Sequence, residues 1–266
     1  MHFGARRRRR GVVAVSDASL EVFAGESVGL VGESGSGKTT LGLCVAGLLT
    51  PTSGRVRFRG EVVNAPGRRP SVPRRRGVQI VFQDPSSTLN PRRTVGSVLE
   101  EILRVHELCQ RDSASARVAE LLELVGLPPQ LAARRPNRLS GGQRQRVAIA
   151  RALALDPDLV VADEIVSALD ASVQAQILNL LADLRTSLGL TLVFISHDLA
   201  VVRQVCDRVV VMHEGRLVES GSAEELLARP RHPYTRDLLA AVPSLHIGES
   251  QGRGSGPLGT AEGGAR

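Results

Sequence analysis

The stretch Gly32–Thr39, GESGSGKT, has the residue types that bind phosphate groups. Its glycines let successive backbone N–H groups point at phosphate oxygens, at the positive end of a following helix. Lys38 is the only lysine in a chain with 34 Lys and Arg residues. Its compact ammonium can reach between two phosphates inside the loop, where a planar guanidinium is too wide. We therefore predict that this loop binds nucleotide phosphates and that the Thr39 hydroxyl is directed at Mg²⁺.

Two carboxylates follow an apolar run in the stretch DLVVADE. The run suits a buried strand, and Asp163 and Glu164 come at its carboxyl end. In a doubly wound sheet this edge lies beside the phosphate loop. We expect Asp163 to hold Mg²⁺ through water and Glu164 to orient and deprotonate an attacking water. Two surface acids after a strand are the alternative, which the upstream phosphate loop makes the minor one.

These residues need a sheet and helices that position them. Apolar runs rich in β-branched residues predict parallel strands covered on both faces; the runs are SVGLVG (27–32), VQIVFQ (78–83), LVVAD (159–163) and TLVFIS (191–196). The segment 39–49 predicts the helix that follows the phosphate loop. Val118, Leu121, Leu122 and Val125 recur at helical spacing and predict an amphipathic helix in the middle third.

Three further segments have local signals. Val56 and Phe58 alternate with arginines, which predicts a half-exposed antiparallel strand near a turn. Ser222 and Glu225 predict a capping box for a short helix that ends before Pro230. Residues 247–266 are rich in Gly and Ser with little apolar content, and we expect a disordered tail there.

Composition limits the class of protein. Apolar residues make up 42% and charged residues 23% of the chain, which is ordinary for a globular protein. The longest nearly apolar stretch, 41–49, is far shorter than the roughly 20 residues of a membrane span. The three cysteines, Cys44, Cys109 and Cys206, are widely spaced, which fits a reducing compartment rather than a disulfide framework.

The formal net charge is +7, and arginines cluster at 6–10, 74–76, 92–93 and 134–135. Such clusters can contact nucleic acid or an anionic membrane surface. No aromatic residues lie between the arginines, which argues against a platform for single-stranded nucleic acid. We favour solvated loops, then proximity to a membrane surface, and we expect no nucleic-acid partner.

The stretch 139–153, LSGGQRQRVAIARAL, resembles the signature of ATP-binding cassette (ABC) ATPases. Ser140, Gly141 and Gly142 would open a helix and offer a hydroxyl and free N–H groups to an anion. In that family the anion is the γ-phosphate of ATP held by the opposite subunit, so that two cassettes enclose two nucleotides head to tail. The resemblance covers roughly residues 3–245.

The remaining family motifs follow in the family's order. Gln83 comes 45 residues after Lys38, and His197 comes 33 residues after Glu164. The resemblance implies a catalytic role for Glu164, His197 and Lys38. It implies ATP contacts from Gly32, Glu33, Ser34, Gly35, Ser36, Gly37, Lys38, Thr39, Thr40, Gln83 and Phe3. It implies Mg²⁺ contacts from Thr39, Gln83 and, through water, Asp163. It implies contacts to the partner's ATP from Ser140, Gly141, Gly142, Gln143 and Asp170.

The family's architecture is also implied. We expect an α/β fold with a P-loop NTPase core and a mostly parallel sheet, an N-terminal antiparallel β-subdomain and an inserted α-helical subdomain. The ATPase domain would span 1–246, with the helical subdomain at about 88–150. Ile165 follows Glu164 where relatives usually have proline, so the loop after this residue is expected to differ.

Two stretches indicate a branch of the family. FQDPSSTLNP (82–91) and RHPYTRDLLAAVPSL (231–245) resemble motifs of ATPases in importers of dipeptides, oligopeptides and nickel. The resemblance implies an ATP-hydrolysing subunit for peptide import, with ATP and Mg²⁺, at the cytoplasmic face of the membrane. Its partners would be a second ABC ATPase subunit, two transmembrane permease subunits and, indirectly, an extracytoplasmic substrate-binding protein. Nickel or another small solute as cargo, or a soluble ABC ATPase without a transport role, are the alternatives.

Overall fold

The computed structural model describes residues 2–3, 12–68 and 76–241, without the side chains of residues 2, 3, 12 and 111. The predicted tail at 247–266 and the end of the 231–245 segment lie outside these ranges. Within them, the α/β architecture expected from the sequence is confirmed.

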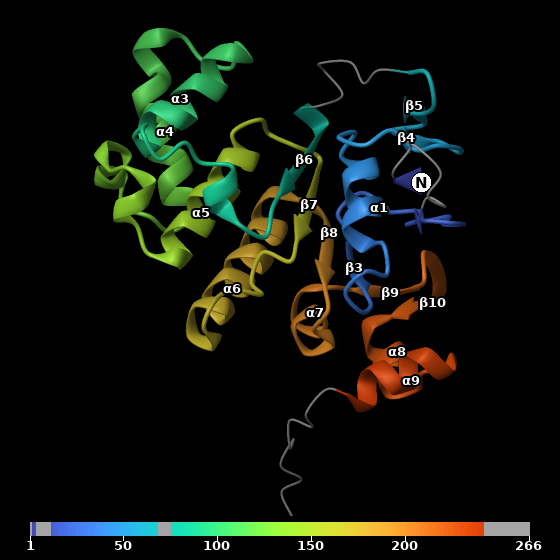
Figure 1. Ribbon diagram of the computed structural model, residues 1–266. Helices are drawn as coiled ribbons and strands as arrows, with labels where there is room; N and C mark the ends of the chain where they lie inside the picture. The colour runs from blue at the N-terminus through green and yellow to red at the C-terminus, as the bar shows by residue number, and fades with distance from the viewer. Residues whose placement is uncertain (1, 4–11, 69–75, 242–266) are drawn as a thin grey trace, which may run out of the picture.

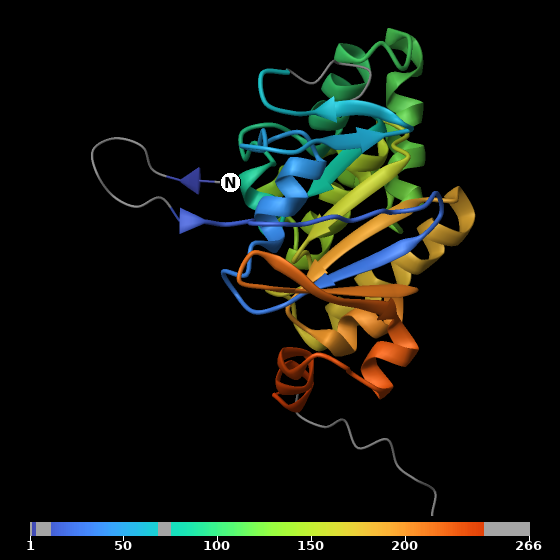
Figure 2. The same cartoon turned by 90° about the vertical axis from the view of Figure 1, so that its right-hand side faces the viewer.

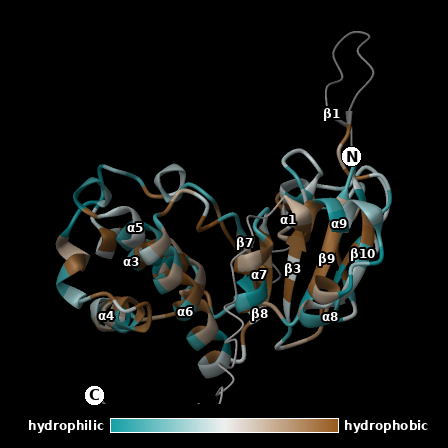
Figure 3. Cartoon of the chain, turned by 90° about the horizontal axis from the view of Figure 1, so that it is seen from below, coloured by the Kyte–Doolittle hydropathy of each residue, from teal (hydrophilic) through white to brown (hydrophobic). Residues whose placement is uncertain are grey.

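A six-stranded sheet with the strand order β10-β9-β3-β8-β7-β6 forms the centre of the fold. Its strands are β3 (Ser27–Val31), β6 (Val78–Val81), β7 (Leu159–Asp163), β8 (Thr191–Ser196), β9 (Arg208–His213) and β10 (Arg216–Ser222). All neighbours are parallel except β10, which runs antiparallel to β9. The four apolar runs singled out in the sequence form β3, β6, β7 and β8, and Figure 3 shows β3 and β9 in the brown of hydrophobic residues.

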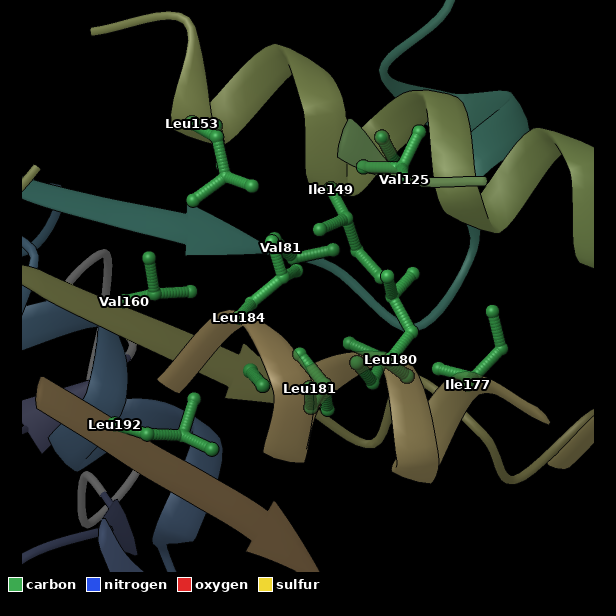
Figure 4. Close-up of a cluster of buried hydrophobic side chains, with 14 of the residues drawn as sticks. Val81, Val125, Ile149, Leu153, Val160, Ile177, Leu180, Leu181, Leu184 and Leu192 are labelled. Atoms are coloured by element: carbon green, nitrogen blue, oxygen red, sulfur yellow. The ribbon is translucent and has the colours of Figure 1, made fainter. Parts of the chain in front are cut away.

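Helices cover both faces of the sheet because successive residues of each strand point to opposite sides. On β8, Val193 and Ile195 pack with α1 (Lys38–Val45), whereas Leu192 and Phe194 belong to the larger core on the other face. That core contains α5 (Gly141–Leu153), α6 (Ala171–Leu188) and α7 (Leu199–Val205). Figure 4 shows Leu184 of α6 meeting Val81 and Val160 of the sheet.

A group of helices lies beside the β6 edge of the sheet (Figure 1). It consists of α3 (Val95–Val105) and α4 (Ala114–Leu124), which pack on each other and on α5, together with the short turns η1 (Pro85–Ser87), η2 (Arg111–Ser113), η3 (Pro129–Ala133) and η4 (Pro136–Arg138). Val118, Leu121, Leu122 and Val125 are all buried here, which confirms the amphipathic helix. The boundaries proposed for a helical subdomain, about 88–150, stay a prediction.

Two small antiparallel pairs accompany the main sheet. β4 (Val56–Phe58) and β5 (Glu61–Asn64) form a hairpin, and β1 (His2–Phe3) pairs with β2 (Val12–Val13). The hairpin turn places Arg59 and Gly60 at φ 51° and 79°, the left-handed region that such turns require. The buried Asn64 amide donates to the carbonyl oxygens of Cys44 and Leu49, which fixes the hairpin to the end of α1.

The chain ends its described part with α8 (Ala223–Ala228) and α9 (Pro233–Ala240). Figures 1 and 2 both show these helices beside β10, at the opposite end of the molecule from α3 and α4. Half of the expected capping box is present, because Ser222 Oγ accepts the Glu225 N–H at 3.2 Å. The other predicted bond, from the Ser222 N–H to the Glu225 carboxylate, is wrong, since this carboxylate binds Arg231 instead. Among the described residues, no helix has the length and apolar character needed to cross a membrane.

Candidate functional site

Five residues or loops predicted from the sequence meet at one edge of the sheet, where its parallel strands end. The loop Gly32–Thr39 follows β3, Gln83 follows β6 and His197 follows β8. Asp163 is the last residue of β7, and Glu164 comes next. The carboxyl edge of a parallel sheet is where open α/β folds bind ligands. The topology therefore explains why residues distant in the sequence gather here.

The phosphate loop curls sharply because three of its glycines have positive φ angles, Gly32 at 150° among them. Gly35 and Gly37 have φ angles of 83° and 106°. A Cβ added to Gly37 would lie 2.2 Å from the carbonyl oxygen of Ala14, so only glycine fits there. Gly37 also precedes α1, and no side chain caps that helix. Its first N–H groups are thus left for an anion.

Lys38 points back into this loop. Its Nζ donates to the carbonyl oxygens of Gly32 and Glu33, both at 2.7 Å, and the residue is 4% exposed. Burial lowers the pKa of the Lys38 ammonium, although the nearby Glu164 and Asp163 oppose the shift. The strong partners of this buried cation are neutral carbonyl oxygens. If they are exchanged for phosphate oxygens, the ammonium gains partners of opposite charge, which bind it more strongly. This arrangement fits ATP phosphates.

Two of the three Mg²⁺ ligands expected from the sequence, Thr39 and Asp163, are in direct contact. The Thr39 hydroxyl donates to Asp163 Oδ1 at 3.1 Å, and Asp163 is 5% exposed. Burial raises the pKa of this carboxyl, while the bond from Thr39 and the charge of Lys38 oppose the shift. A hydroxyl and a carboxylate are the hard oxygen donors that Mg²⁺ selects, so these residues fit the ion.

Glu164 has a constrained backbone. Its φ is 49°, in the left-handed region, and its N–H donates to the carbonyl oxygen of Ile195 at 3.0 Å. Ile165, which replaces the usual proline, is 1% exposed and belongs to the main core, so it anchors the loop after Glu164. His197 Nδ1 lies 3.7 Å from Glu164 Oε2. The two side chains therefore face the same space.

Gln83 is linked to Glu164 through a residue that the sequence analysis did not single out. Gln83 Nε2 donates to Ser167 Oγ at 2.9 Å, and Ser167 Oγ donates to the Glu164 carbonyl oxygen at 2.9 Å. The sequence could have indicated Ser167 by its position, because it begins the stretch SALD (167–170) three residues after Glu164. A turn closed by the Ser167 N–H and the Glu164 carbonyl oxygen brings the Ser167 side chain close to Glu164. Two hydrogen bonds in series thus link the Gln83 side chain to the backbone of Glu164.

The signature residues form a second group at the start of α5. Ser140 Oγ accepts the Gln143 N–H at 3.2 Å, and Gln143 Oε1 accepts the Ser140 N–H at 3.0 Å, which makes a complete capping box. Asp170 caps α6 in a similar way by accepting the Val173 N–H at 2.9 Å, and this bond contributes most to lowering the pKa of the exposed Asp170 carboxyl. A Cβ on Gly142 would lie 2.5 Å from Val173 Cγ1, so the two helix starts are in close contact.

Among the described residues, no hydrogen bond or ion pair is found between Ser140 or Gln143 and the phosphate loop. Within the loop, Glu33, Ser34 and Gly35 are exposed, and Ser36 is buried. Thr40 is half-buried in the first turn of α1. Phe3 lies in β1, but its side chain is outside the described part of the chain, so its contact with adenine stays a prediction.

Residues 15–167 match the family described as ABC transporter. A putative peptide import ATP-binding protein of Brucella ovis is 52% identical over 230 residues, which cover 86% of this chain and 73% of the relative. The chain belongs to the ABC transporter ATPase family. The glutathione import ATP-binding protein GsiA of Salmonella paratyphi A is 50% identical over 237 residues, covering 89% of this ABC ATPase and 38% of GsiA.

Solved structures agree with the family. The ABC ATPase described here resembles cbiO1 from Clostridium perfringens, part of the transporter complex cbiONQ, with a TM-score of 0.72 and 31% identity over 81% of this chain and 84% of cbiO1. It also resembles the ATP-binding cassette MJ0796, solved as a dimer bound to ADP and phosphate, with a TM-score of 0.71 and 30% identity. That match covers 82% of this chain and 94% of MJ0796. The expected fold class and the ATPase activity are thereby confirmed.

The C-terminal part of this ABC ATPase has a match of its own. Residues 218–262 match the family described as oligopeptide/dipeptide transporter, C-terminal region. The matched range contains β10 from Val218 onward, α8 and α9. The resemblance noted at 231–245 is therefore confirmed as a family trait, whereas the roles of individual residues in this segment stay open.

Proposed function

We propose that this chain is the ATP-hydrolysing subunit of an importer of dipeptides or oligopeptides. The observation that supports this cargo most is the match of residues 218–262 to the oligopeptide/dipeptide transporter C-terminal region. Relatives named for peptide and glutathione import, at 52% and 50% identity, point to the same cargo class, since glutathione is itself a small peptide.

In this proposal, Lys38 and the N–H groups of the phosphate loop bind the β- and γ-phosphates of ATP. The ammonium moves from the carbonyl oxygens of Gly32 and Glu33 to phosphate oxygens, which restores charge pairing to a buried cation. Thr39, Gln83 and Asp163 hold Mg²⁺, with Asp163 acting through water. The bound Mg²⁺ neutralises charge that develops on the phosphate oxygens.

Glu164 and His197 carry the hydrolytic step. The Glu164 carboxylate orients a water molecule for attack on the γ-phosphorus and takes up its proton. His197 contacts the γ-phosphate beside Glu164, since its Nδ1 lies 3.7 Å from Glu164 Oε2. The backbone of Glu164, which follows the last residue of β7, is in the left-handed region, a strained conformation of the kind found at functional sites.

The second half of each ATP site comes from a second ABC ATPase subunit, identical or homologous. Ser140, Gly141, Gly142, Gln143 and Asp170 would contact the partner's nucleotide, and the exposure of Ser140 and Asp170 supports this role. MJ0796 was solved as a dimer in a post-hydrolysis state. The closed dimer would act from the cytoplasmic face of the membrane on two permease subunits, served by an extracytoplasmic binding protein.

Co-purification tests the assembly. The tagged full chain is recovered from detergent-solubilised membranes of its own cells, and two membrane-spanning subunits and an ATPase partner are expected with it. Recovery with ribosomes or DNA alone would contradict a transport role. A Glu164→Gln chain serves as the matched control, because it should assemble normally but not hydrolyse ATP.

The cargo is tested on the reconstituted complex with its binding protein. Dipeptides and oligopeptides are expected to stimulate ATP hydrolysis by the wild-type complex, and nickel salts are not. The reverse result would favour the alternative of nickel as cargo, and stimulation by neither would argue for another small solute.

A further inference from the structure

The C-terminal helix α9 is held firmly against the main sheet. The Glu219 carboxylate, on β10, accepts the backbone N–H groups of Arg231 and His232 at 2.8 and 3.0 Å. His232 Nδ1 in turn accepts the Tyr234 N–H at 3.2 Å and caps the helix, whose first residue is Pro233. The His-Pro-Tyr stretch is thus a helix start tied to β10, and it fixes where the side chain of Tyr234 goes.

Tyr234, the only tyrosine of the chain, lies at the edge of the sheet that carries the ATP site. Its ring packs on His213, the last residue of β9, with 3.8 Å between ring centroids and 32° between planes. β9 pairs with β3, the strand that leads into the phosphate loop. The Tyr234 hydroxyl oxygen accepts the Glu33 N–H at 2.9 Å. Burial raises the pKa of the Tyr234 phenol, so the group is neutral at physiological pH.

The Glu33 N–H and the Gly32 carbonyl belong to the same peptide group. Tyr234 holds the N–H end of this group, and Lys38 Nζ donates to its carbonyl end at 2.7 Å. One peptide plane therefore lies between the phenol of the C-terminal helix and the ammonium of the phosphate loop. Hydrogen bonds at the two ends of a peptide group polarise it and strengthen each other.

We propose that Tyr234 is a positioning residue for the ATP site, which holds the Gly32–Glu33 peptide in the orientation that aims Lys38. Without the phenol oxygen this peptide can rotate, and the carbonyl that holds the ammonium in place between nucleotide-binding events turns with it. The inference rests on the ATP-binding role of the loop and needs neither a permease nor a peptide. It gives α9, which lies outside the range matched to the ABC transporter family, a direct part in nucleotide binding.

The coupling has to act in both directions. If α9 sets the orientation of the loop, nucleotide in the loop must change the stability of α9 by the same free energy. A movement of α9 imposed by a partner would change the affinity for ATP, because the only link needed is the 2.9 Å hydrogen bond from Glu33 to Tyr234.

Tyr234→Phe removes the acceptor and keeps the ring on His213. A neutral hydrogen bond on an exposed N–H is worth a small net free energy, so we expect KM and the dissociation constant for a fluorescent ATP analogue to rise about two- to tenfold. The value of kcat should change by less than about twofold, because the chemistry at Glu164 is untouched. Asp237→Asn, at an exposed position on the same helix, is the matched control and should leave both constants unchanged.

Hydrogen exchange of residues 231–241 supplies a readout that a purely structural role would not move. In the wild-type chain, the ATP analogue should slow exchange in α9, and in Tyr234→Phe this slowing should be lost while the exchange rate without nucleotide stays similar. Unchanged affinity in Tyr234→Phe, a tighter complex, or equal weakening in Asp237→Asn would each overturn the proposal. Both measurements compare nucleotide binding by the variants with that of the wild-type chain. A negative result would therefore overturn the role of Tyr234 and leave the proposal of peptide import unaffected.

Discussion

The phosphate-loop group and the signature group differ in how they satisfy their polar atoms. Lys38 and Asp163 are nearly inaccessible, at 4% and 5% exposure, and their hydrogen bonds run to the loop and to Thr39. Ser140 and Asp170 are exposed at helix starts, where each side chain caps its own helix. The phosphate-loop group, which we call the enclosed half of the proposed ATP site, thus buries Lys38 and Asp163, and the signature group, the open half, presents Ser140 and Asp170 at the surface.

This difference has an energetic meaning. Burial shifts the pKa of Lys38 down and that of Asp163 up, so both charges are held in the fold at a cost. The caps at Ser140 and Asp170 instead stabilise the helices that they start. The enclosed half therefore holds charges that a ligand could pair, whereas the polar side chains of the open half are satisfied within their own helices.

The largest expected effect comes from replacing Glu164, which lies in the enclosed half. In Glu164→Gln the amide cannot take a proton from water, so ATP hydrolysis should fall by roughly 10²–10⁴-fold. Nucleotide binding should persist, and dimers should accumulate in the closed form, as measured by size-exclusion chromatography with ATP. Turnover within about twofold of wild type would remove Glu164 as the base.

The open half is tested by comparing two substitutions, each of which removes a serine that caps a helix. Ser140→Ala and Ser222→Ala each remove a hydroxyl that accepts an N–H at 3.2 Å, so each should lower the free energy of unfolding by about 1 kcal/mol. Only Ser140→Ala should also lower ATPase activity, by roughly tenfold, because it alone removes a group proposed to contact the partner's phosphate. Equal activity in the two variants would contradict the contact.

The smallest expected effect is on stability. The raised pKa of Asp163 means that ionising this carboxyl costs free energy in the folded chain. The cost is absent below the unfolded pKa, grows as pH rises from the unfolded to the folded pKa, and is fully present above the folded pKa. Asp163→Asn should therefore raise Tm by about 2–4 °C near neutral pH without nucleotide, and the gain should vanish in acid. Hydrolysis should be lost. A lower Tm at neutral pH would show that pairing with Lys38 outweighs burial.

Local patterns predicted the elements that carry these groups. The β-branched apolar runs identify β3, β6, β7 and β8 because strands covered on both faces need apolar residues throughout. The apolar residues in 118–125 recur at helical spacing because one face of α4 is buried, and this spacing identifies the helix. Since parallel strands end at one edge, the sequence also predicts that Lys38, Asp163 and His197 gather, although their individual roles stay predictions.

Contacts between distant segments could not be foreseen. Tyr234 and Glu33 are 201 residues apart, and Gln83 and Ser167 are 84 apart. Nothing in either local stretch fixes the other's position, because the packing of whole helices decides it. Glu225 shows the same limit on a small scale, since Arg231 competes for the carboxylate that a capping box would have used.

The close approach of Gly142 to Val173 has a consequence for substitutions at either position. Any side chain at position 142 would collide with Val173 Cγ1, at 2.5 Å from the first added carbon. Position 142 can gain volume only if Val173 moves or loses volume, so the effects of substitutions at the two positions on stability should not be additive. Gly142, proposed above to contact the partner's nucleotide, is thus also the spacer that lets the starts of α5 and α6 approach each other.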